Sequence, residues 1–379
     1  MIIRDLKQDI EKYLDKTKKI IVIFGARQVG KTTLLKDIFA GEKDIVWYNG
    51  DDRTTQDLFA RADLADLAPL TKGKKTVVID EAQRIEDIGL KLKILQDALG
   101  DEVQFVATGS SSFDLANKIN EPLTGRKWTF RLFTPNIREL VKTNNYVSEV
   151  ANLDNRLIYG SYPAVVSHLE DAKKLLSELT SDNLYKDILN FGDIIKTDKL
   201  SKILKALALQ VGSQVSMNEI GQLVGLDGKT VDKYISLLEQ SFVIFRLPSY
   251  AKNLRNELKA SEKIFFYDNG IRNAIINDYR VLEDRQDVGA LFENYIVSEL
   301  IKLYPSDNVY FWRTKDQKEI DYVVEHNGEL TAIEIKYNEK KNVSLPGAFV
   351  NAYHPAHEFL INRENYARIL VGEDLEYLK

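Results

Sequence analysis

The chain has 379 residues, enough for two or three domains of ordinary size, and its hydrophobic fraction of 44% excludes a largely disordered protein. Its 52 basic and 57 acidic residues give a net charge of −5, which excludes a uniformly basic DNA-coating protein and requires any nucleic-acid contact to use a local patch. The sequence has no cysteine, no signal-peptide pattern and no apolar run long enough to cross a bilayer, so it predicts a cytoplasmic protein without disulfides, thiol catalysis or a membrane partner.

The first elements lead into a phosphate-binding motif. Residues 2–14 have the spacing of a short amphipathic helix, and the continuous apolar run at 20–24 is typical of a strand buried on both faces. The sequence GARQVGKT follows at 25–32 and has the P-loop pattern G-x-x-x-x-G-K-[ST] between a strand and a helix. We expect Lys31 to reach the β- and γ-phosphates of ATP and Thr32 to supply a hydroxyl to Mg²⁺. The residues expected to wrap the nucleotide are Gly25, Ala26, Arg27, Gln28, Val29, Gly30, Lys31, Thr32 and Thr33.

Two further apolar strands predict the rest of an ATP-hydrolysing site. A strand at 76–81 ends in Asp80 and Glu81, and with a P-loop upstream we expect Asp80 to hold the Mg²⁺ shell and Glu81 to polarise the attacking water. The alternative is a pair of acids in the first turn of a helix. The next apolar strand ends in hydroxyls, so Thr108 or Ser110 is expected either to sense the γ-phosphate or to cap the following helix. Between the P-loop and these strands the pattern predicts a strand at 44–48 and a helix at 54–67.

Arg126 precedes an alternating strand at 128–132. An arginine placed against a transferring phosphoryl group strongly accelerates the transfer, so Arg126 is a candidate finger or nucleotide sensor. The alternative is a structural ion pair. If Arg126 acts on the nucleotide of a neighbouring copy, the chain must form a homo-oligomer.

The middle of the chain is predicted to be helical from about 136 to 200, with a break at 159–163. A helix-turn-helix pattern follows. It consists of predicted helices at 217–226 and 229–239, a turn at 227–228 and a wing strand at 242–247.

Lys229, Thr230 and Lys233 lie at the start of the second helix of this pattern, where a helix-turn-helix contacts DNA. The alternative is a packing module within an ATPase lid. Basic and acidic residues cancel over 201–245, which is not the basic footprint of a DNA reader. A nearby stripe of Lys252, Arg255 and Lys259 is a second candidate for phosphate contacts or a solvated face.

The C-terminal third predicts a helix followed by a hairpin that carries acids. The helix spans 291–303 with Glu293 near its start, and the Asn327-Gly328 pair predicts a two-residue turn. Opposed residue numbers then sum to 655, so Asp321 faces Glu334. The same register places Ile320, Tyr322, Ile333 and Ile335 together on an apolar face. The strands of this region are predicted at 309–314, 319–325 and 330–337.

Asp321, Glu334 and Lys336 form the pattern Asp…Glu-x-Lys on adjacent strands, as in PD-(D/E)xK nucleases. In such a site the acids hold Mg²⁺ or Mn²⁺ and the lysine orients water, and Glu293 would complete the metal shell. The alternative is a cross-strand pair between Lys336 and Glu319, in a site that binds without cutting. His354 and His357 flank a proline and are assigned to a loop rather than to a metal site.

The order of these motifs resembles a family of prokaryotic AAA-type ATPases with a C-terminal nuclease-like domain of unknown function. The resemblance covers the chain nearly end to end. It rests on residues 25–35, 78–83, 108–111, 124–126, 159–163, 230–234, 266–270, 312–314, 319–322 and 333–336.

The resemblance implies an α/β fold in four parts. These are an AAA-type P-loop ATPase core at 1–145, a helical lid at 146–200, a winged-helix module at 201–260 and a restriction-endonuclease-like PD-(D/E)xK domain at 261–379. It supports the roles given above to Lys31, Thr32, Asp80 and Glu81, and it places Arg313 beside the acids. Family members often carry arginine where this chain has Lys186, so an arginine-type nucleotide contact is not carried over to that position.

Two sites for phosphate chemistry on one chain predict an ATP-hydrolysing protein that binds ATP and Mg²⁺. Its nucleotide state would control a C-terminal domain that binds nucleic acid, DNA rather than RNA, with Mg²⁺-dependent cleavage as an open question. The rival hypothesis is a nucleotide-dependent regulatory or scaffold ATPase whose C-terminal domain binds without cleaving. A small-molecule kinase is disfavoured by the helix-turn-helix and by the second acidic site.

Overall fold

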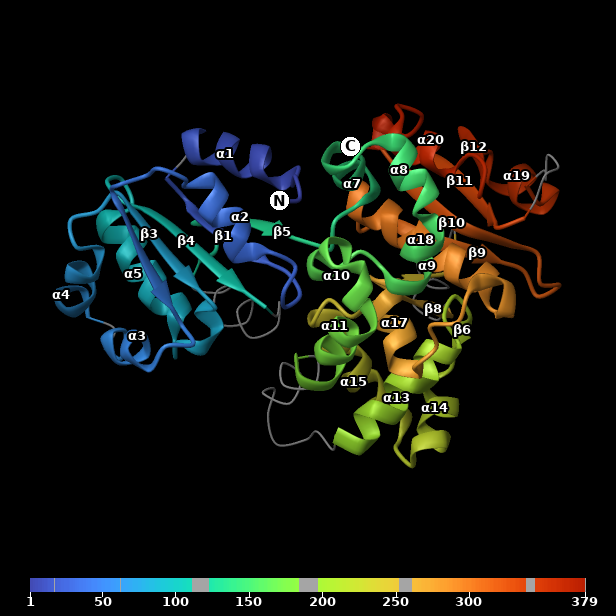
Figure 1. Cartoon of the computed structure of the whole chain (residues 1–379), viewed down its shortest axis with the longest axis horizontal. Helices are drawn as coiled ribbons and strands as arrows, with labels where there is room; N and C mark the ends of the chain where they lie inside the picture. Colours follow the sequence, from blue (N-terminus) through green and yellow to red (C-terminus); the bar gives the residue numbers. More distant parts are fainter. Residues whose placement is uncertain are drawn as a thin grey trace.

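The structure is a computed structural model of the chain and describes residues 1–16, 18–61, 63–110, 123–183, 197–251, 261–338 and 345–378. In Figure 1 a parallel sheet lies at one end of the molecule and a second sheet lies at the other end, with a group of helices below the second sheet. Five residues named above lie outside the described ranges: Ser111, Lys186, Lys252, Arg255 and Lys259.

The N-terminal sheet is entirely parallel and has the order β2-β3-β4-β1-β5. Its strands are β1 (Ile20–Phe24), β2 (Ile45–Asn49), β3 (Thr76–Asp80), β4 (Gln104–Gly109) and β5 (Lys127–Arg131). Every residue of β1 and β4 is buried, which explains why these strands are continuous apolar runs rather than alternating ones. The strands predicted from the sequence are therefore confirmed, and their carboxyl ends meet at one edge of the sheet.

Helices cover both faces of this sheet (Figure 1). They are α1 (Leu6–Lys16), α2 (Lys31–Ile38), α3 (Arg53–Leu58), α4 (Leu64–Leu67) and α5 (Ile88–Leu99). The single helix expected at 54–67 is wrong, because α3 ends at Leu58 and α4 starts separately at Leu64. The Phe59 ring is fully buried, edge-on to Tyr48 of β2 at 5.3 Å between centroids, and this anchor turns the chain away from the helix axis.

The helices after β5 lie on the side of the C-terminal sheet (Figure 1). They are α7 (Ile137–Thr143), α8 (Tyr146–Ala151), α9 (Leu153–Tyr159), α10 (Pro163–Ser167) and α11 (Ala172–Glu178). Ile137 and Leu157 are buried in one core with residues of the C-terminal part, and Arg138 donates to the carbonyl of Leu370 at 2.7 Å and pairs with Glu376 at 2.6 Å. The expected boundary at 145/146 therefore falls within a helical segment that packs on the C-terminal part.

The expected break at 159–163 is confirmed between α9 and α10. Gly160 has φ +70°, and a side chain there would collide with the carboxylate of Asp268. That carboxylate is fully buried and accepts hydrogen bonds from the backbone N–H groups of Ser161, Gly270 and Ile271. The Asp268-Asn269-Gly270 motif is thus a structural joint between α9, α10 and the helix α17 (Asn269–Ile276).

The next module alternates helices with a small antiparallel sheet of order β6-β8-β7. Its elements are α13 (Thr197–Leu209), β6 (Gln214–Val215), α14 (Met217–Val224), α15 (Gly228–Gln240), β7 (Ile244–Pro248) and β8 (Glu262–Phe266). Ser216 and Asp227 cap α14 and α15 through their side chains, which confirms the two helices and the turn expected from the sequence. The expected boundary at 260/261 cuts this sheet, because β8 pairs with β7 along its whole length.

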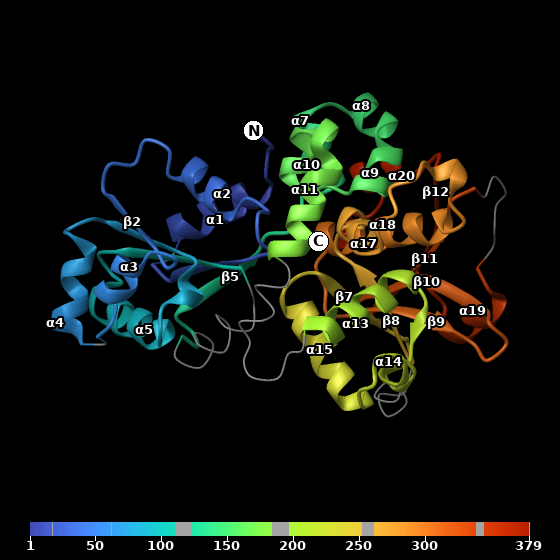
Figure 2. The same cartoon turned by 60° about the horizontal axis from the view of Figure 1, so that its bottom comes forward.

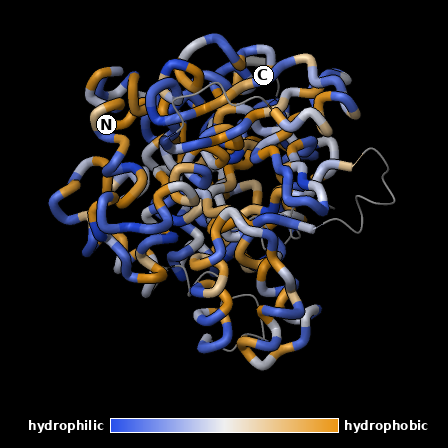
Figure 3. Tube along the Cα trace, turned by 90° about the vertical axis from the view of Figure 1, so that its right-hand side faces the viewer, coloured by the Kyte–Doolittle hydropathy of each residue, from blue (hydrophilic) through white to orange (hydrophobic). Residues whose placement is uncertain are grey.

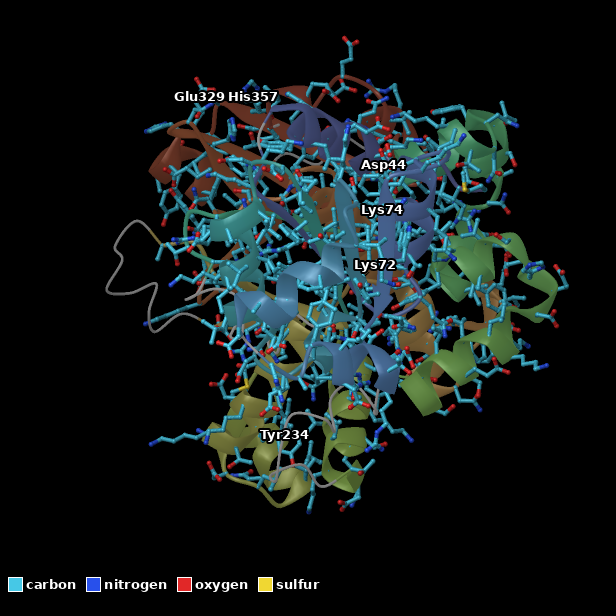
Figure 4. All side chains as sticks on the ribbon, turned by 90° about the vertical axis from the view of Figure 1, so that its left-hand side faces the viewer. Asp44, Lys72, Lys74, Tyr234, Glu329 and His357 are labelled. Carbon is cyan, nitrogen blue, oxygen red and sulfur yellow. The ribbon has the colours of Figure 1, made fainter. Side chains whose placement is uncertain are left out.

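Figures 1 and 2 label α14 and α15 near the bottom of the molecule, and Figure 3, turned about the vertical axis, shows the bottom of the molecule projecting as a lobe. Figure 4 labels Tyr234 on this lobe. Val231, Tyr234, Ile235 and Leu238 of α15 are all buried, as the helical spacing predicts. Among the described residues, no helix is long and apolar enough to span a membrane.

The C-terminal sheet has the order β12-β11-β10-β9. Its elements are α18 (Val288–Leu303), β9 (Val309–Arg313), β10 (Glu319–His326), β11 (Glu329–Lys336), α19 (Gly347–Tyr353), β12 (His357–Asn362) and α20 (Tyr366–Val371). Asn327 and Gly328 both have positive φ, and Tyr322 pairs with Ile333, so the predicted turn and register are confirmed.

The pairing of β10 with β9 contains a bulge that the sequence analysis missed. Ile320 pairs with Trp312 and Val323 pairs with Tyr310, so β10 has one extra residue between these pairs. Ile320 consequently packs with Trp312 and not with the cluster that contains Tyr322, and the expected common face of Ile320 and Tyr322 is wrong. The extra residue lies at Asp321-Tyr322, where it changes the direction of the Asp321 side chain.

Candidate functional site

The P-loop lies between β1 and α2 at the carboxyl edge of the N-terminal sheet (Figure 1). Gly30 has φ +100°, a conformation that glycine adopts at low cost, and Gly25 lies so close to the carbonyl of Leu132 that no Cβ fits. Lys31 is 4% exposed, and its Nζ donates to the carbonyls of Gly25 at 3.0 Å and Ala26 at 3.1 Å. The loop therefore forms a narrow cradle with a cation at its centre.

Thr32 and Asp80 meet beside this cradle. The Thr32 hydroxyl donates to one oxygen of Asp80 at 2.6 Å, and the Thr108 hydroxyl donates to the other oxygen. A hydroxyl and a carboxylate next to a phosphate cradle are the oxygen donors that Mg²⁺ takes with a nucleotide. The residues present therefore fit MgATP, with Thr32 and Asp80 as the protein's contribution to the metal shell.

Glu81 follows directly and has φ +49°, which is unusual for a residue with a side chain. Its N–H donates to the Thr108 hydroxyl at 3.1 Å, and its carboxylate lies 3.9 Å from Lys31. Gln83 donates to that carboxylate at 2.6 Å and to the Ser110 hydroxyl at 3.0 Å. No site role was predicted for Gln83, although it ends the motif at 78–83 that carries the family resemblance.

A pocket of about 280 Å³ opens beside the P-loop. Its lining includes Ile2, Val29, Thr33 and Leu34, together with residues of α10 and the position after it, namely Pro163, Ala164, Ser167 and His168. Its size is close to the lower end of small-molecule sites, and its lining combines apolar side chains with a few polar groups.

Arg126 lies away from this site. Its carbonyl accepts from Ile20 at 2.9 Å and Lys127 pairs with Ile20, which places Arg126 at the amino edge of the sheet. Five residues of β1, at about 3.3 Å each, put roughly 16 Å between this edge and the P-loop. Figure 4 labels Asp44 and Lys74, which precede β2 and β3 at the same edge. Arg126 pairs there with Asp97 at 2.5 Å, which favours the structural ion pair, and its role as a finger or sensor stays a prediction.

The helix-turn-helix residues lie on the projecting lobe. Lys229 and Lys233 are exposed at the start of α15, while Thr230 donates through its N–H and its hydroxyl to Asp227 and so belongs to the helix cap. Arg246 of β7 adds no free positive charge, because it pairs with acids on α15 and β8.

The second group of predicted site residues gathers at the C-terminal sheet. Glu293 of α18 and Glu319 and Asp321 of β10 each place one oxygen within 4.8 Å of the others. Within the described parts of the chain, this is the one such group of potential metal ligands. The ammonium of Lys263 pairs with Glu293 at 2.9 Å and with Glu319, and Lys263 is 2% exposed. Lys263 was missed, although a lysine within an apolar strand signals a buried acidic partner.

Asp321 also contacts the neighbouring strand β11. It accepts from the N–H of Ile335 at 2.8 Å and pairs with Lys336 at 3.3 Å. Lys336 also pairs with Glu334 at 2.6 Å, whereas Glu319 pairs with Lys263 and with Arg313 at 3.4 Å. The expected alternative pair between Lys336 and Glu319 is therefore wrong.

The pKa values of these groups follow from burial and from their mutual charge. Burial, and then the charge of Asp321, raises the pKa of Glu293 to about 7 against the opposing effect of Lys263. The same two causes raise the pKa of Glu334 to about 7 against the effect of Lys336. Burial lowers the pKa of Lys263, but Glu293, Asp321 and Glu319 outweigh burial and raise it above its ordinary value.

Four acids and three cations thus share this cluster, and an ammonium already lies between Glu293 and Glu319. The carboxylates suit a divalent ion chemically, but as arranged they do not fit one together with Lys263. His354 and His357 do not contribute: His357 lies against Glu329 at 3.8 Å at the other end of β11, as Figure 4 labels.

Comparison with known families agrees with the N-terminal geometry. Residues 17–141 match the family model described as an AAA domain. This part of the chain is thus similar to AAA domains. Residues 150–280 and 288–372 match models described as domains of unknown function (DUF8612 and DUF4143), which support no nuclease assignment.

Relatives of similar length are uncharacterised. A protein of Mycobacterium tuberculosis is 25% identical over 86% of this chain and 72% of its own length. A protein of Haemophilus influenzae is 24% identical over 94% of this chain and 89% of its own length. A protein of Methanocaldococcus jannaschii is 26% identical over 77% of this chain and 70% of its own length.

Solved structures show only distant likeness. The Pif1 helicase of Candida albicans has 13% identity and a TM-score of 0.29, covering 48% of each chain. A signal-transduction ATPase with numerous domains from Pyrococcus horikoshii has 12% identity and a TM-score of 0.29, over 81% of this chain and 46% of that one. The chain thus spans about half the length of these structures.

Proposed function

We propose that this protein is an AAA-type switch that hydrolyses ATP. The observation that carries the proposal is the meeting of Thr32, Asp80 and Glu81 beside the P-loop cradle. An acid that holds the metal shell and a second acid that faces the reacting phosphate are the two groups that ATP hydrolysis needs from this edge of the sheet. The expected finger role of Arg126 on a second copy stays a prediction, as do the homo-oligomer and the cytoplasmic location.

Bound MgATP would supply the phosphoryl group and the divalent charge that stabilises its transfer. Lys31 would exchange its two carbonyl partners for phosphate oxygens, and Thr32 and Asp80 would hold the metal through their oxygens. Glu81 orients the attacking water and takes its proton. Gln83 acts through Glu81 as a positioning residue, because its amide holds the carboxylate toward Ser110.

The nucleoside would lie in the pocket between the P-loop and α10. Thr33 and Leu34 line the part of this pocket next to the P-loop. Ile2 and Val29 offer apolar contact to a base. Because residues of α10 also line this pocket, nucleotide binding would connect the ATPase sheet with the helices that follow it.

Phosphate release tests the hydrolysis proposal. Glu81→Gln should retain binding of a fluorescent ATP analogue and lose about 10²–10³-fold in turnover, since a positioned base contributes on this scale. Lys31→Ala should lose binding itself. Glu102→Gln, an exposed acid of the same domain, is the matched control and should behave as wild type. Wild-type turnover in Glu81→Gln would contradict the proposal.

We further propose that α13 to β8 form a winged helix that contacts DNA. The order α13-β6-α14-α15-β7-β8 and its three-stranded antiparallel sheet support this assignment. Lys229 and Lys233 are exposed at the start of α15, the position that enters a groove in helix-turn-helix proteins.

DNA binding by the lobe is tested with a fluorescent duplex. Replacing Lys229 and Lys233 together by alanine should weaken binding and lower the salt dependence, because each phosphate contact releases a counterion. The same double change at Lys202 and Lys205, exposed on α13, is the matched control. If both double variants weaken DNA binding equally, the binding is only non-specific electrostatic attraction and the proposal is overturned. Tighter binding to an RNA of the same sequence would overturn the choice of DNA.

For the C-terminal part we propose a PD-(D/E)xK-like domain that binds nucleic acid without cleaving it. Asp321 on β10 and Glu334 and Lys336 on β11 are juxtaposed as in the nuclease pattern, which supports the likeness. The pairing of Lys263 with Glu293 favours binding over cleavage, because a cation is already present.

Plasmid nicking with Mg²⁺ or Mn²⁺, with and without ATP, tests this choice. Wild type should leave the plasmid intact under every combination. Nicking that disappears in Glu334→Ala and persists in Glu329→Ala, an exposed acid of the same strand, would instead establish a metal-dependent nuclease.

A further inference from the structure

We propose that Lys263 is the resident cation of the C-terminal acidic cluster: its ammonium fills the place of a divalent metal between Glu293, Glu319 and Asp321 and locks β8 to the C-terminal sheet. This inference goes beyond the proposed ATPase function and does not depend on it, because no group of the P-loop takes part.

The contacts of Lys263 join three separate elements. Lys263 lies on β8, the central strand of its sheet, where it is paired with Gln214 on one side and with Leu247 on the other. From there its ammonium reaches Glu293 on α18 and Glu319 on β10. A buried ammonium with two carboxylate partners satisfies the charge that burial would otherwise make costly.

The surroundings of the ammonium on the β8 side favour a lysine over a hydrated metal ion. Its Nζ lies 5.4 Å from the ring centre of Phe311 and 5.9 Å from that of Phe265, and Lys263 is 2% exposed. Aromatic faces attract an ammonium but offer no oxygen ligand, and Mg²⁺ gives up its waters reluctantly. The wall of the cluster on the β8 side therefore suits the lysine and not a metal with its waters.

The remaining acids of the cluster also have cationic partners. Lys336 pairs with Asp321 and Glu334, and Arg313 pairs with Glu319. A divalent ion added to this set would meet the like charge of Lys263 at the same carboxylates. Removal of the Lys263 ammonium, in contrast, would leave Glu293, Glu319 and Asp321 as oxygen ligands within 4.8 Å of one another. That spacing lets three carboxylates share one ion.

Lys263→Met tests the proposal, because methionine keeps much of the length of the side chain without its charge. Binding of Mn²⁺ to the full chain is measured without nucleotide by electron paramagnetic resonance and by the shift in melting temperature. Lys263→Met should bind one Mn²⁺ at least about tenfold more tightly than wild type, and its melting temperature should rise with Mn²⁺ because the ion binds only the folded state. The double variant Lys263→Met with Asp321→Asn should lose this site.

Lys302→Met is the matched control, since Lys302 is also a buried lysine paired with an acid, Glu299 at 3.0 Å, but lies outside the acidic cluster. It should gain no Mn²⁺ site. Lys263→Arg retains a cation and should gain none either. A folded Lys263→Met that binds no more Mn²⁺ than wild type would overturn the proposal.

If Lys263→Met does not fold, Mn²⁺ binding by wild type and by Asp321→Asn, which both retain Lys263, tests the same proposal. Wild type and Asp321→Asn should bind Mn²⁺ equally, because the ion has no access to Asp321 while the ammonium is present. Mn²⁺ binding by wild type that is lost in Asp321→Asn would show that the cluster already holds a metal and would overturn the proposal. These outcomes are independent of ATP turnover, so they are distinguishable from a failure of the ATPase proposal.

Discussion

Replacing Gly25 by alanine should strongly weaken nucleotide binding while leaving the chain folded. An alanine Cβ would overlap the carbonyl oxygen of Leu132 and would lie 3.2 Å from both the Leu132 carbonyl carbon and Val29 Cγ2. The obstacle on the β5 side is backbone, so the P-loop itself has to move. Overpacking of this kind costs about 1–3 kcal/mol, less than the stability of a typical domain. A displacement of about 1 Å in a site that positions a substrate costs about 10²-fold in function.

Titration with a fluorescent ATP analogue and a thermal melt separate these two effects. Gly25→Ala should bind the analogue at least about 10²-fold more weakly than wild type while keeping a cooperative melt. Gly289→Ala is the control, because an added Cβ there meets no atom within 4 Å. Wild-type affinity in Gly25→Ala would refute the argument that close approach of the P-loop to β5 shapes the cradle.

Three further predictions follow from individual side chains. Arg126→Ala should leave the ATP turnover of dilute protein unchanged, and a loss at low concentration would contradict the ion-pair role within one chain; a loss that appears only as the concentration rises would support the finger acting between copies. Arg156→Ala should lower the free energy of unfolding in urea by about 3–5 kcal/mol, because it leaves Glu149 buried and unpaired, and most of this loss should return when Glu149→Leu and Arg156→Met are combined. Bonds from Arg280 lower the pKa of Asp278 to about 2, from an ordinary 3.8, so this carboxylate stabilises the fold above pH 3.8 and loses that effect as the pH falls toward 2. The stability difference between wild type and Asp278→Asn, measured by denaturant unfolding at several pH values, should shrink over that interval, and a constant difference would contradict the assignment.

Features that depend on neighbouring residues were predictable from the sequence. The P-loop is a local motif, and the apolar runs that become β1, β3 and β4 are continuous because both faces of those strands are buried. The register of β10 with β11 followed from the Asn327-Gly328 turn, since a two-residue turn leaves only one pairing. The bulge at Asp321 was not predictable in this way, because it depends on the pairing of β10 with β9.

The expected domain boundaries stay predictions, but packing across them depends on the tertiary structure in the same way. Helical spacing shows that α7 and α9 are helices, but not which core buries their apolar faces. Ile137 and Leu157 pack on the C-terminal part, and β8 completes a sheet that begins before the expected boundary. The hydrophobic effect is not directional, so an apolar helix face can be buried against any apolar surface. Which surface it contacts is therefore set by the tertiary structure.

The sequence by itself determined the chemistry available at each site: a lysine and a threonine for phosphate and metal at the P-loop, and acids with a lysine on the C-terminal hairpin. Only the tertiary structure decided which charges meet. Arg126 lies at the edge of its sheet opposite the nucleotide site, and Lys263 lies among acids that are 30 or more residues away in the chain. The physical reason is that a charge interacts over a few ångströms of space, whatever its distance along the sequence, so its partner is known only when the chain is folded.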